Sequence, residues 1–115
     1  MSARTRELEK RIEGLVDPES IMIEIMDVFQ ETEIIPDVGK YYTFIYIPKT
    51  QDIAFDQHPL VAVTEIYQWG FKGLNFHWRE VRNYTWLEIA GFLHVIKNNE
   101  IDYMRGIKYA RYLVS

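Results

Sequence analysis

The stretch from Tyr41 to Trp78 constrains the fold most, because aromatic and β-branched residues fill it and turn residues divide it. Its first segment, residues 41–47, reads YYTFIYI and predicts a strand whose two faces are both apolar or aromatic. Such a strand is either central in a sheet and covered on both sides, or buried in an assembly, because an exposed one would aggregate.

Two more strands are expected in this stretch, over residues 60–67 and 71–78. The turn Gln68-Trp69-Gly70 joins them into a hairpin, in which Gly70 would adopt a positive φ. Gly73 inside the second strand indicates a bulge or the close approach of another backbone. The sequence therefore predicts a strand-rich centre.

The N-terminal region predicts two helices. Residues 2–16 carry an apolar stripe made of Leu8, Ile12, Leu15 and Val16, which is narrow enough that the helix needs a surface to lie on. A second helix should begin at Asp17-Pro18, where Asp17 caps and Pro18 takes the first helical position. Its apolar stripe consists of Ile21, Met22, Ile25, Met26 and Phe29.

A third helix is expected over residues 86–97. Thr85 and Glu88 match a capping box, and the residues that follow are apolar on all sides, which is typical of a buried helix. Residues 107–114 are compatible with either a last strand or a helical turn.

These elements predict the α+β class: N-terminal helices followed by a small, strongly bent antiparallel sheet or SH3-like barrel with one packed helix. We expect a helical arm at residues 1–38 and a small β-barrel-like domain at 39–115, with its helix at about 86–97. A chain of 115 residues can bury a core of its own.

Composition excludes several classes of protein. With 48% hydrophobic residues the chain is not intrinsically disordered, and without cysteine it has neither disulfides nor thiolate metal sites. It has neither an apolar run of about 18 residues nor a signal peptide, so we expect no membrane insertion. Residues 1–39 hold ten acids and four bases, an acidic balance that disfavours a dedicated nucleic-acid binder.

Few residues suggest chemistry. The three histidines lack metal-ligand spacing, although His58 lies near Asp52 and Asp56. Asn75 and His77 share a strand face and are weak candidates for ligand binding, without a carboxylate that the sequence can place beside them. We therefore expect no catalytic residue, no metal and no cofactor, and the chain is not predicted to be an enzyme.

The C-terminal region alternates basic and aromatic residues, a pattern that can bind single-stranded nucleic acid. Glu100 and Asp102 interrupt it, so nucleic acid is an alternative partner and not the main one. The residues concerned are Lys97, Tyr103, Arg105, Lys108, Tyr109, Arg111 and Tyr112.

Three short patterns carry a family resemblance: Y-x-TF-x-Y followed by KT over residues 41–50, D-x-x-PLV over 56–61, and GF-x-GLN-x-H over 70–77. They resemble small, mostly uncharacterised proteins of T-even-like tailed phages, including marine and cyanobacterial ones. The resemblance covers about a third of the chain. It implies a virion component or a small accessory factor, and no catalytic residue.

We therefore expect a non-catalytic structural or assembly protein that docks onto other subunits of a phage tail, baseplate or neck, or onto itself. It would reside in the virion and be assembled in the host cytoplasm. The alternatives are a small nucleic-acid-binding accessory protein and an anti-defence or other small-ligand-binding protein. The candidate interface residues are Leu8, Ile12, Leu15, Tyr41, Tyr46, Trp69, Phe71 and Trp86.

Overall fold

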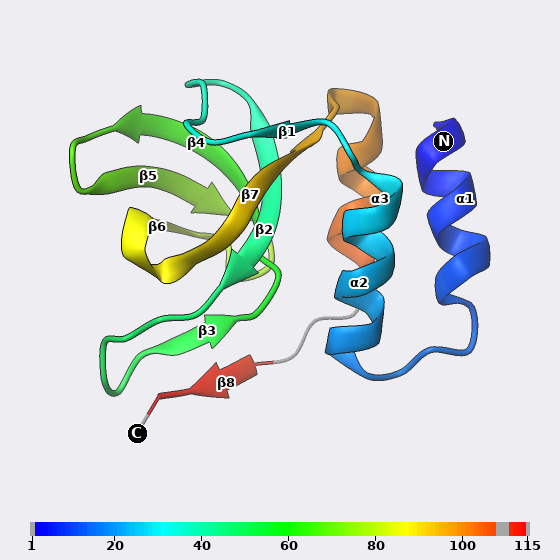
Figure 1. Ribbon diagram of the computed structural model, residues 1–115, viewed down its shortest axis with the longest axis horizontal. Coiled ribbons are helices and arrows are strands. Elements are labelled where there is room, and N and C mark those ends of the chain that lie inside the picture. Colours follow the sequence, from blue (N-terminus) through cyan, green and yellow to red (C-terminus); the bar gives the residue numbers. More distant parts are fainter. Residues whose placement is uncertain (1, 108–110, 115) are drawn as a thin grey trace.

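A computed structural model describes residues 2–107 and 111–114. It confirms the α+β class, with the helices gathered on one side of a strongly bent sheet (Figure 1). The elements in chain order are α1 (Ala3–Ile12), α2 (Pro18–Val28), β1 (Thr32–Glu33), β2 (Tyr41–Tyr46), β3 (Ala54–Asp56), β4 (Leu60–Ile66), β5 (Gly70–Asn75), β6 (Glu80–Thr85), a 3₁₀ helix (Trp86–Glu88), β7 (Ile89–Ile96), a second 3₁₀ helix (Asn98–Glu100), α3 (Ile101–Gly106) and β8 (Arg111–Leu113).

The main sheet has six antiparallel strands in the order β1-β7-β2-β4-β5-β6, and β3 pairs with β8 in a separate two-stranded sheet. The main sheet bends into a barrel-like form. Its interior, here called the barrel core, contains Tyr42, Phe44, Tyr46, Val61, Val63, Phe71, Tyr84, Leu93 and Val95.

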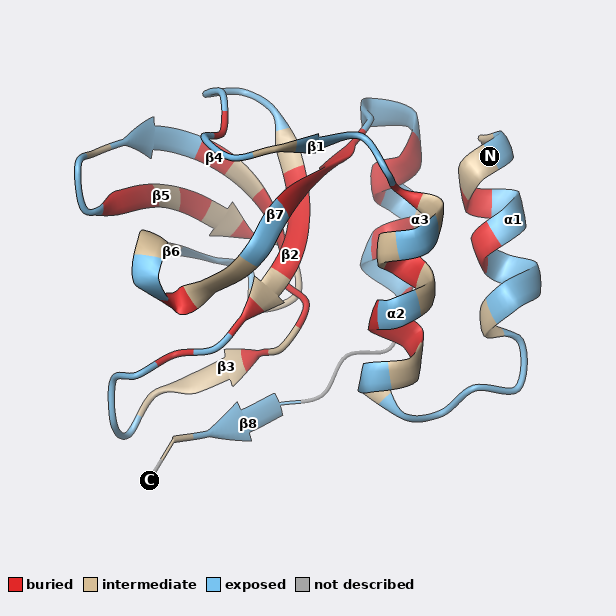
Figure 2. Ribbon diagram, in the orientation of Figure 1, coloured by how far each residue is buried: buried red, intermediate tan, exposed pale blue. Residues whose placement is uncertain are grey.

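The strand β2 lies at the centre of the molecule and is covered on both faces. Tyr42, Phe44 and Tyr46 point into the barrel core. Tyr41 and Ile45 point the other way and pack against the helices. Figure 2 shows this burial along β2. Of the two explanations that the sequence left open for an apolar strand, the first is correct, because the chain itself supplies both covers.

The second core lies between the sheet and the helices and is called the helical core. Its buried members are Leu8, Ile21, Met22, Ile25, Phe29, Leu60, Ile96, Ile101, Met104 and Ile107. Asp17 caps α2 by accepting a hydrogen bond from the Ser20 N–H at 2.9 Å, and Pro18 begins the helix, as predicted. The helical arm at residues 1–38 and the body at residues 39–115 therefore contribute side chains to one and the same apolar core.

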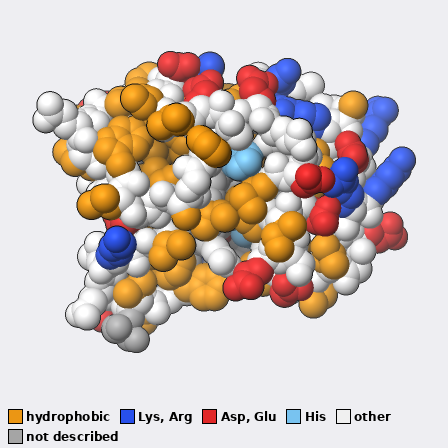
Figure 3. Space-filling view, viewed as in Figure 1, with side chains coloured by type: hydrophobic (Ala, Val, Ile, Leu, Met, Phe, Trp, Pro, Cys, Tyr) orange, Lys and Arg blue, Asp and Glu red, His pale blue; other side chains and the backbone are white. Residues whose placement is uncertain are grey.

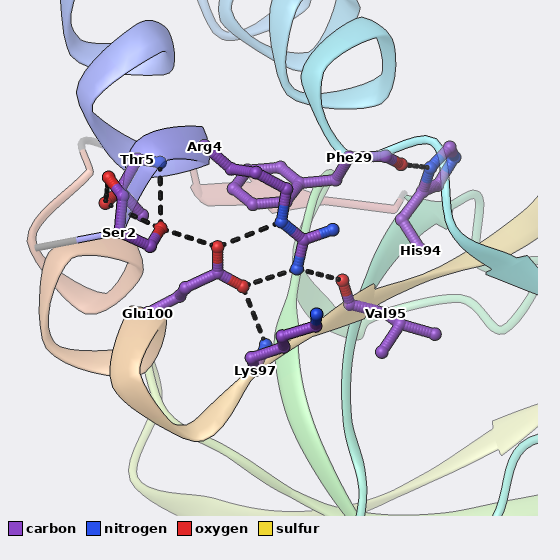
Figure 4. Close-up of polar contacts among 8 residues, drawn as sticks. All are labelled: Ser2, Arg4, Thr5, Phe29, His94, Val95, Lys97 and Glu100. Atoms are coloured by element: carbon purple, nitrogen blue, oxygen red, sulfur yellow. Dashed lines mark hydrogen bonds and ion pairs between the residues drawn. The ribbon is translucent and has the colours of Figure 1, made fainter.

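The N-terminus of α1 is fixed to the body by a buried carboxylate (Figure 4). Glu100, which is 1% exposed, accepts hydrogen bonds from Arg4 at 2.5 and 3.0 Å and from the Ser2 hydroxyl at 2.7 Å. It also accepts one from the Lys97 N–H at 2.9 Å. Burial alone would raise the pKa of Glu100, but these donors outweigh it and hold the pKa below its usual value.

The predicted helix over residues 86–97 is wrong. Only Trp86–Glu88 is helical, as one 3₁₀ turn, and Ile89–Ile96 forms β7. Thr85 does not form a capping box, because its hydroxyl bonds to the Glu88 side chain. Since β7 packs Leu93 into the barrel core and Ile96 into the helical core, both of its faces are apolar. Apolarity alone does not separate such a strand from a buried helix. The packed helix is α3.

Smaller differences concern strand ends. The hairpin is present, but β5 ends at Asn75 and not at Trp78. The Gly73 prediction is confirmed on both counts: the β4–β5 register shifts opposite Gly73, and a Cβ at Gly73 would lie 2.9 Å from the backbone carbonyl oxygen of Ala62. In the C-terminal segment, Arg111–Leu113 forms a strand, whereas residues 108–110 lie outside the described part of the chain.

Candidate functional site

An open apolar groove lies between the β4–β5 hairpin and β7. We call it the isoleucine groove. Its volume is about 500 Å³, within the range of ligand-binding clefts. No lining side chain carries a charge. The lining residues are Ile34, Ile35, Ile66, Tyr67, Gln68, Trp86, Ile89 and Gly91.

One wall of the groove is the tip of the β4–β5 hairpin. The Tyr67 N–H donates to the Gly70 carbonyl at 2.8 Å and closes the turn. Only glycine fits at position 70, because a Cβ there would lie 1.9 Å from the Tyr84 carbonyl oxygen. The rings of Tyr67 and Trp69 stack at 4.9 Å. The wall is therefore built from aromatic rings on a tight turn.

Trp86 connects this wall to the start of β7, which also lines the groove. Its indole N–H donates to the Gln68 carbonyl at 2.7 Å, and the N–H of its backbone donates to the Trp69 carbonyl at 3.1 Å. The Trp86 ring also contacts Phe71 of the barrel core, with ring centroids 5.7 Å apart. These contacts hold the hairpin tip in a fixed position relative to β7.

The opposite wall is made by Ile34 and Ile35, which follow β1 and are 75% and 66% exposed. Trp69, Leu87 and Phe92 are exposed as well. Figure 3 shows hydrophobic side chains gathered over the barrel half of this face, while most charged side chains lie over the helices and along the top. An apolar surface of this kind is suited to bury apolar side chains of another molecule.

The predicted interface residues fall into three groups. Leu8, Tyr46 and Phe71 are buried inside the two cores and cannot present a docking surface in this structure. Ile12 and Tyr41 are half-buried against the helical core, and Leu15 is 37% exposed beyond the end of α1. Only Trp69 and Trp86 belong to the groove region. The sequence reasoning missed Ile34 and Ile35, although two adjacent isoleucines before a proline were a usable signal.

The weak ligand candidates serve the local structure. Asn75 is buried, donates from Nδ2 to the Tyr84 hydroxyl at 3.0 Å, and accepts from the His77 and Trp78 N–H groups at 2.9 and 3.0 Å. It therefore stabilises the turn after β5. His77 Nδ1 bonds to the carboxylate of Asp56, a partner that the sequence could not identify.

His58 lies beside this pair, with its ring centroid 6.2 Å from that of His77. It is 2% exposed, and its Nε2 lacks a hydrogen-bond partner among the described residues. Burial lowers the pKa of His58, which keeps the imidazole neutral at physiological pH. Within the described part of the chain, no group of acidic and histidine side chains has the arrangement needed to hold a metal ion.

Basic and aromatic residues meet on a different surface. The guanidinium carbons of Arg82 and Arg111 lie 4.4 and 4.5 Å from the centre of the Trp78 ring, and that of Arg105 lies 5.5 Å from Phe76. Arg82 is also paired with Glu80 at 2.5 Å, which partly neutralises the cluster. Cation–π contacts of this kind stabilise the fold as well as forming a basic surface.

None of the described helices is long and apolar enough to cross a membrane. Searches against protein-family models, curated proteins and solved structures found no match to this chain.

Proposed function

We propose that this chain is a non-catalytic docking protein whose isoleucine groove receives apolar side chains of another protein. One observation carries the proposal: a groove of about 500 Å³ has no charged lining side chain and is walled by Ile34 and Ile35, which are mostly exposed. Large apolar side chains left in water around a fixed hollow are typical of binding sites.

The proposed setting is a tailed phage particle, in which the protein would be a structural or assembly component of the tail, baseplate or neck. The support for this narrower proposal is the resemblance carried by residues 41–77. Mass spectrometry of purified particles tests it directly. If the protein is absent from complete particles and from assembly intermediates, the phage setting is withdrawn, and docking through the groove stands on its own test.

Site-specific photo-crosslinking tests the docking. A photoreactive residue at Gln68, an exposed lining residue, would sample what approaches the groove during expression in the native setting. We expect a discrete protein adduct that disappears in an Ile34→Lys/Ile35→Lys variant, because two ammonium groups cannot be desolvated in an apolar groove.

A matched control adds the same two charges elsewhere. Val81 and Leu113 are 56% and 65% exposed and lie outside the groove lining, so Val81→Lys/Leu113→Lys should leave the adduct unchanged. An adduct that persists equally in both variants, or no adduct at all, would contradict the proposed function.

A second candidate function is binding of single-stranded nucleic acid, favoured by the grouping of Arg82 and Arg111 around Trp78. It predicts binding of an oligonucleotide that weakens steeply as salt rises from about 50 to 200 mM. Fluorescence anisotropy measures this, and Arg111→Gln should reduce the salt dependence by about one phosphate contact. No anisotropy change at low salt would remove this candidate.

A further inference from the structure

We infer that the occupant of the isoleucine groove is an extended segment of a partner protein, which adds to the open edge of β7 as a short strand in continuation of β1. The inference rests on the proposed docking function and specifies the mode of binding. It follows from the pairing of β7 with its neighbours β1 and β2 and from the residues that line the groove beside β7.

The strand β7 has a neighbour along most of one side only. On that side β2 pairs with it from Ile89 to Ile96. On the other side β1 pairs with Leu93 and His94 alone. Among the described residues no strand pairs with the first half of β7 on the β1 side, and its residues there are half-buried or exposed, in contrast to its second half (Figure 2).

The register indicates which backbone groups of this open part lie on the β1 side, and Ile89 and Gly91 line the groove. The Ile47 N–H donates to the Glu88 carbonyl and the Val95 N–H donates to the Glu31 carbonyl, both at 2.8 Å. By the alternation of a regular strand, these bonds and the register assign the N–H and carbonyl of Ala90 to the β2 side and those of Gly91 to the β1 side. The Ile89 N–H is bonded to the Trp86 carbonyl, so the groups that this alternation assigns to an added strand are the carbonyl of Ile89 and the N–H and carbonyl of Gly91.

The chain could have filled this edge but turns away from it. Continued in register, β1 would place Ile34 and Ile35 opposite Phe92 and Gly91. The chain bends at Ile34 and Ile35 and then enters Pro36, which has no N–H to donate. The two isoleucines become the wall of the groove, and the positions opposite the first half of β7 remain free for another strand.

The shape of β7 limits how long that strand can be. Between Thr43 and Ile45 one residue of β2 faces three of β7, and Gly91 has a φ of +82°. Such a bulge disturbs regular pairing and protects an edge from indiscriminate association. A Cβ placed on Gly91 would meet no atom within 4 Å, so no described part of the chain packs over this residue. The site can therefore accept a segment that forms two or three backbone hydrogen bonds with β7 and is flanked by side-chain contacts.

The lining specifies the partner. With no charged side chain in the groove, the inserted side chains should be uncharged and apolar. Because alternate side chains of a strand point to opposite faces, apolar residues should occur at every second position of the bound segment. This mode of recognition combines main-chain bonds, which provide affinity, with pockets for alternate side chains, which provide specificity.

The inference can be tested with a displayed library of random peptides of about eight residues. The library is selected for binding to the full chain and counter-selected against binding to the Ile34→Lys/Ile35→Lys variant. We expect enriched peptides with apolar residues at every second position. The best peptide is then resynthesised in two forms, each N-methylated at one of the two alternating sets of residues. Strand addition predicts that one form loses at least about tenfold in affinity while the other changes little.

Hydrogen exchange provides an independent readout, because the peptide should slow exchange of the Gly91 amide on strand addition. Equal affinity of both methylated forms, or unchanged exchange at Gly91, would overturn strand addition and leave groove docking intact. If no peptide distinguishes the full chain from the lysine variant, the proposed function itself fails. If the free chain forms a dimer in sedimentation that the lysine variant abolishes, the occupant is a second copy, and the inferred partner is wrong.

Discussion

The two sides of the bent sheet differ in how far their apolar side chains are buried. On the helical side, α1 and α2 bring Leu8, Ile21 and Phe29 into a core whose members are at most 8% exposed. On the groove side, Ile34 and Ile35 are 75% and 66% exposed. The same kind of side chain is therefore covered by the chain in one place and left in water in another.

This contrast changes what an amphipathic segment implies. The arm formed by α1 was expected to need a surface to lie on, and the chain itself supplies that surface through the helical core and the Arg4–Glu100 pair. No such cover exists among the described residues over the isoleucine groove. Unmet apolar surface, and not amphipathicity as such, is what points to a partner. The predictions below test this difference between the two sides.

The largest effect is expected from Leu8→Ala. Leu8 is 0% exposed in the helical core, so its truncation removes packing and leaves a cavity that costs about 3 kcal/mol. Urea unfolding and hydrogen exchange of α1 measure this cost. Unchanged protection of α1 would mean that the arm is not held by the helical core.

A smaller loss is expected from Arg4→Ala. The substitution leaves the buried Glu100 carboxylate without its cationic partner, although Ser2 and the Lys97 N–H still donate to it. Because Arg4 itself is 25% exposed, we expect about 2 kcal/mol, below the range for a fully buried pair. Arg6→Ala, at an exposed position of the same helix, is the control and should change stability by less than about 0.5 kcal/mol.

Most of the fold could be predicted from local patterns. The caps at Asp17-Pro18, the tight turn at Gly70 and the bulge opposite Gly73 follow from conformational rules that act within a few residues. Residues 86–97 could not be assigned correctly, because β7 is apolar on both faces and lacks the period-two alternation that identifies most strands. The capping-box pattern at Thr85 then favoured a helix that is only one 3₁₀ turn long.

The site was predicted only in part, because it depends on contacts far apart in the sequence. Trp69 and Trp86 were identified from their aromatic character, whereas Ile34, Ile66 and Ile89 acquire meaning only when the bent sheet brings them together. The same applies to Asp56 and His77, which are 21 positions apart and form a buried pair. Sequence indicates which residues are apolar, and only packing decides which of them remain exposed.

The pH dependence should come partly from the barrel side. His58 is neutral in the folded protein because burial lowers its pKa, whereas in the unfolded chain its pKa is about 6.5. The unfolded state therefore binds more protons below that pH, and stability falls as the pH decreases through about 6.5. Between about pH 7.5 and 5.5 the contribution of His58 is at most about 1.4 kcal/mol.

Urea unfolding at both pH values, for the wild type and for His58→Phe, isolates this contribution. Asp56 and His77 also face the site and are unchanged in the variant, so the difference between the two proteins reports on His58. An equal loss of stability on acidification in both proteins would show that His58 is not held neutral by burial.

The smallest effect on stability should come from the groove side. Ile34→Ala removes a side chain that is 75% exposed, so the free energy of unfolding should change by less than about 0.5 kcal/mol. Partner binding should nevertheless weaken, because the substitution removes part of the groove wall. A loss of stability comparable with that of Leu8→Ala would mean that Ile34 is packed in solution and that the groove is closed. The contrast between the two sides of the sheet would then disappear, and with it the reason to assign docking to this groove.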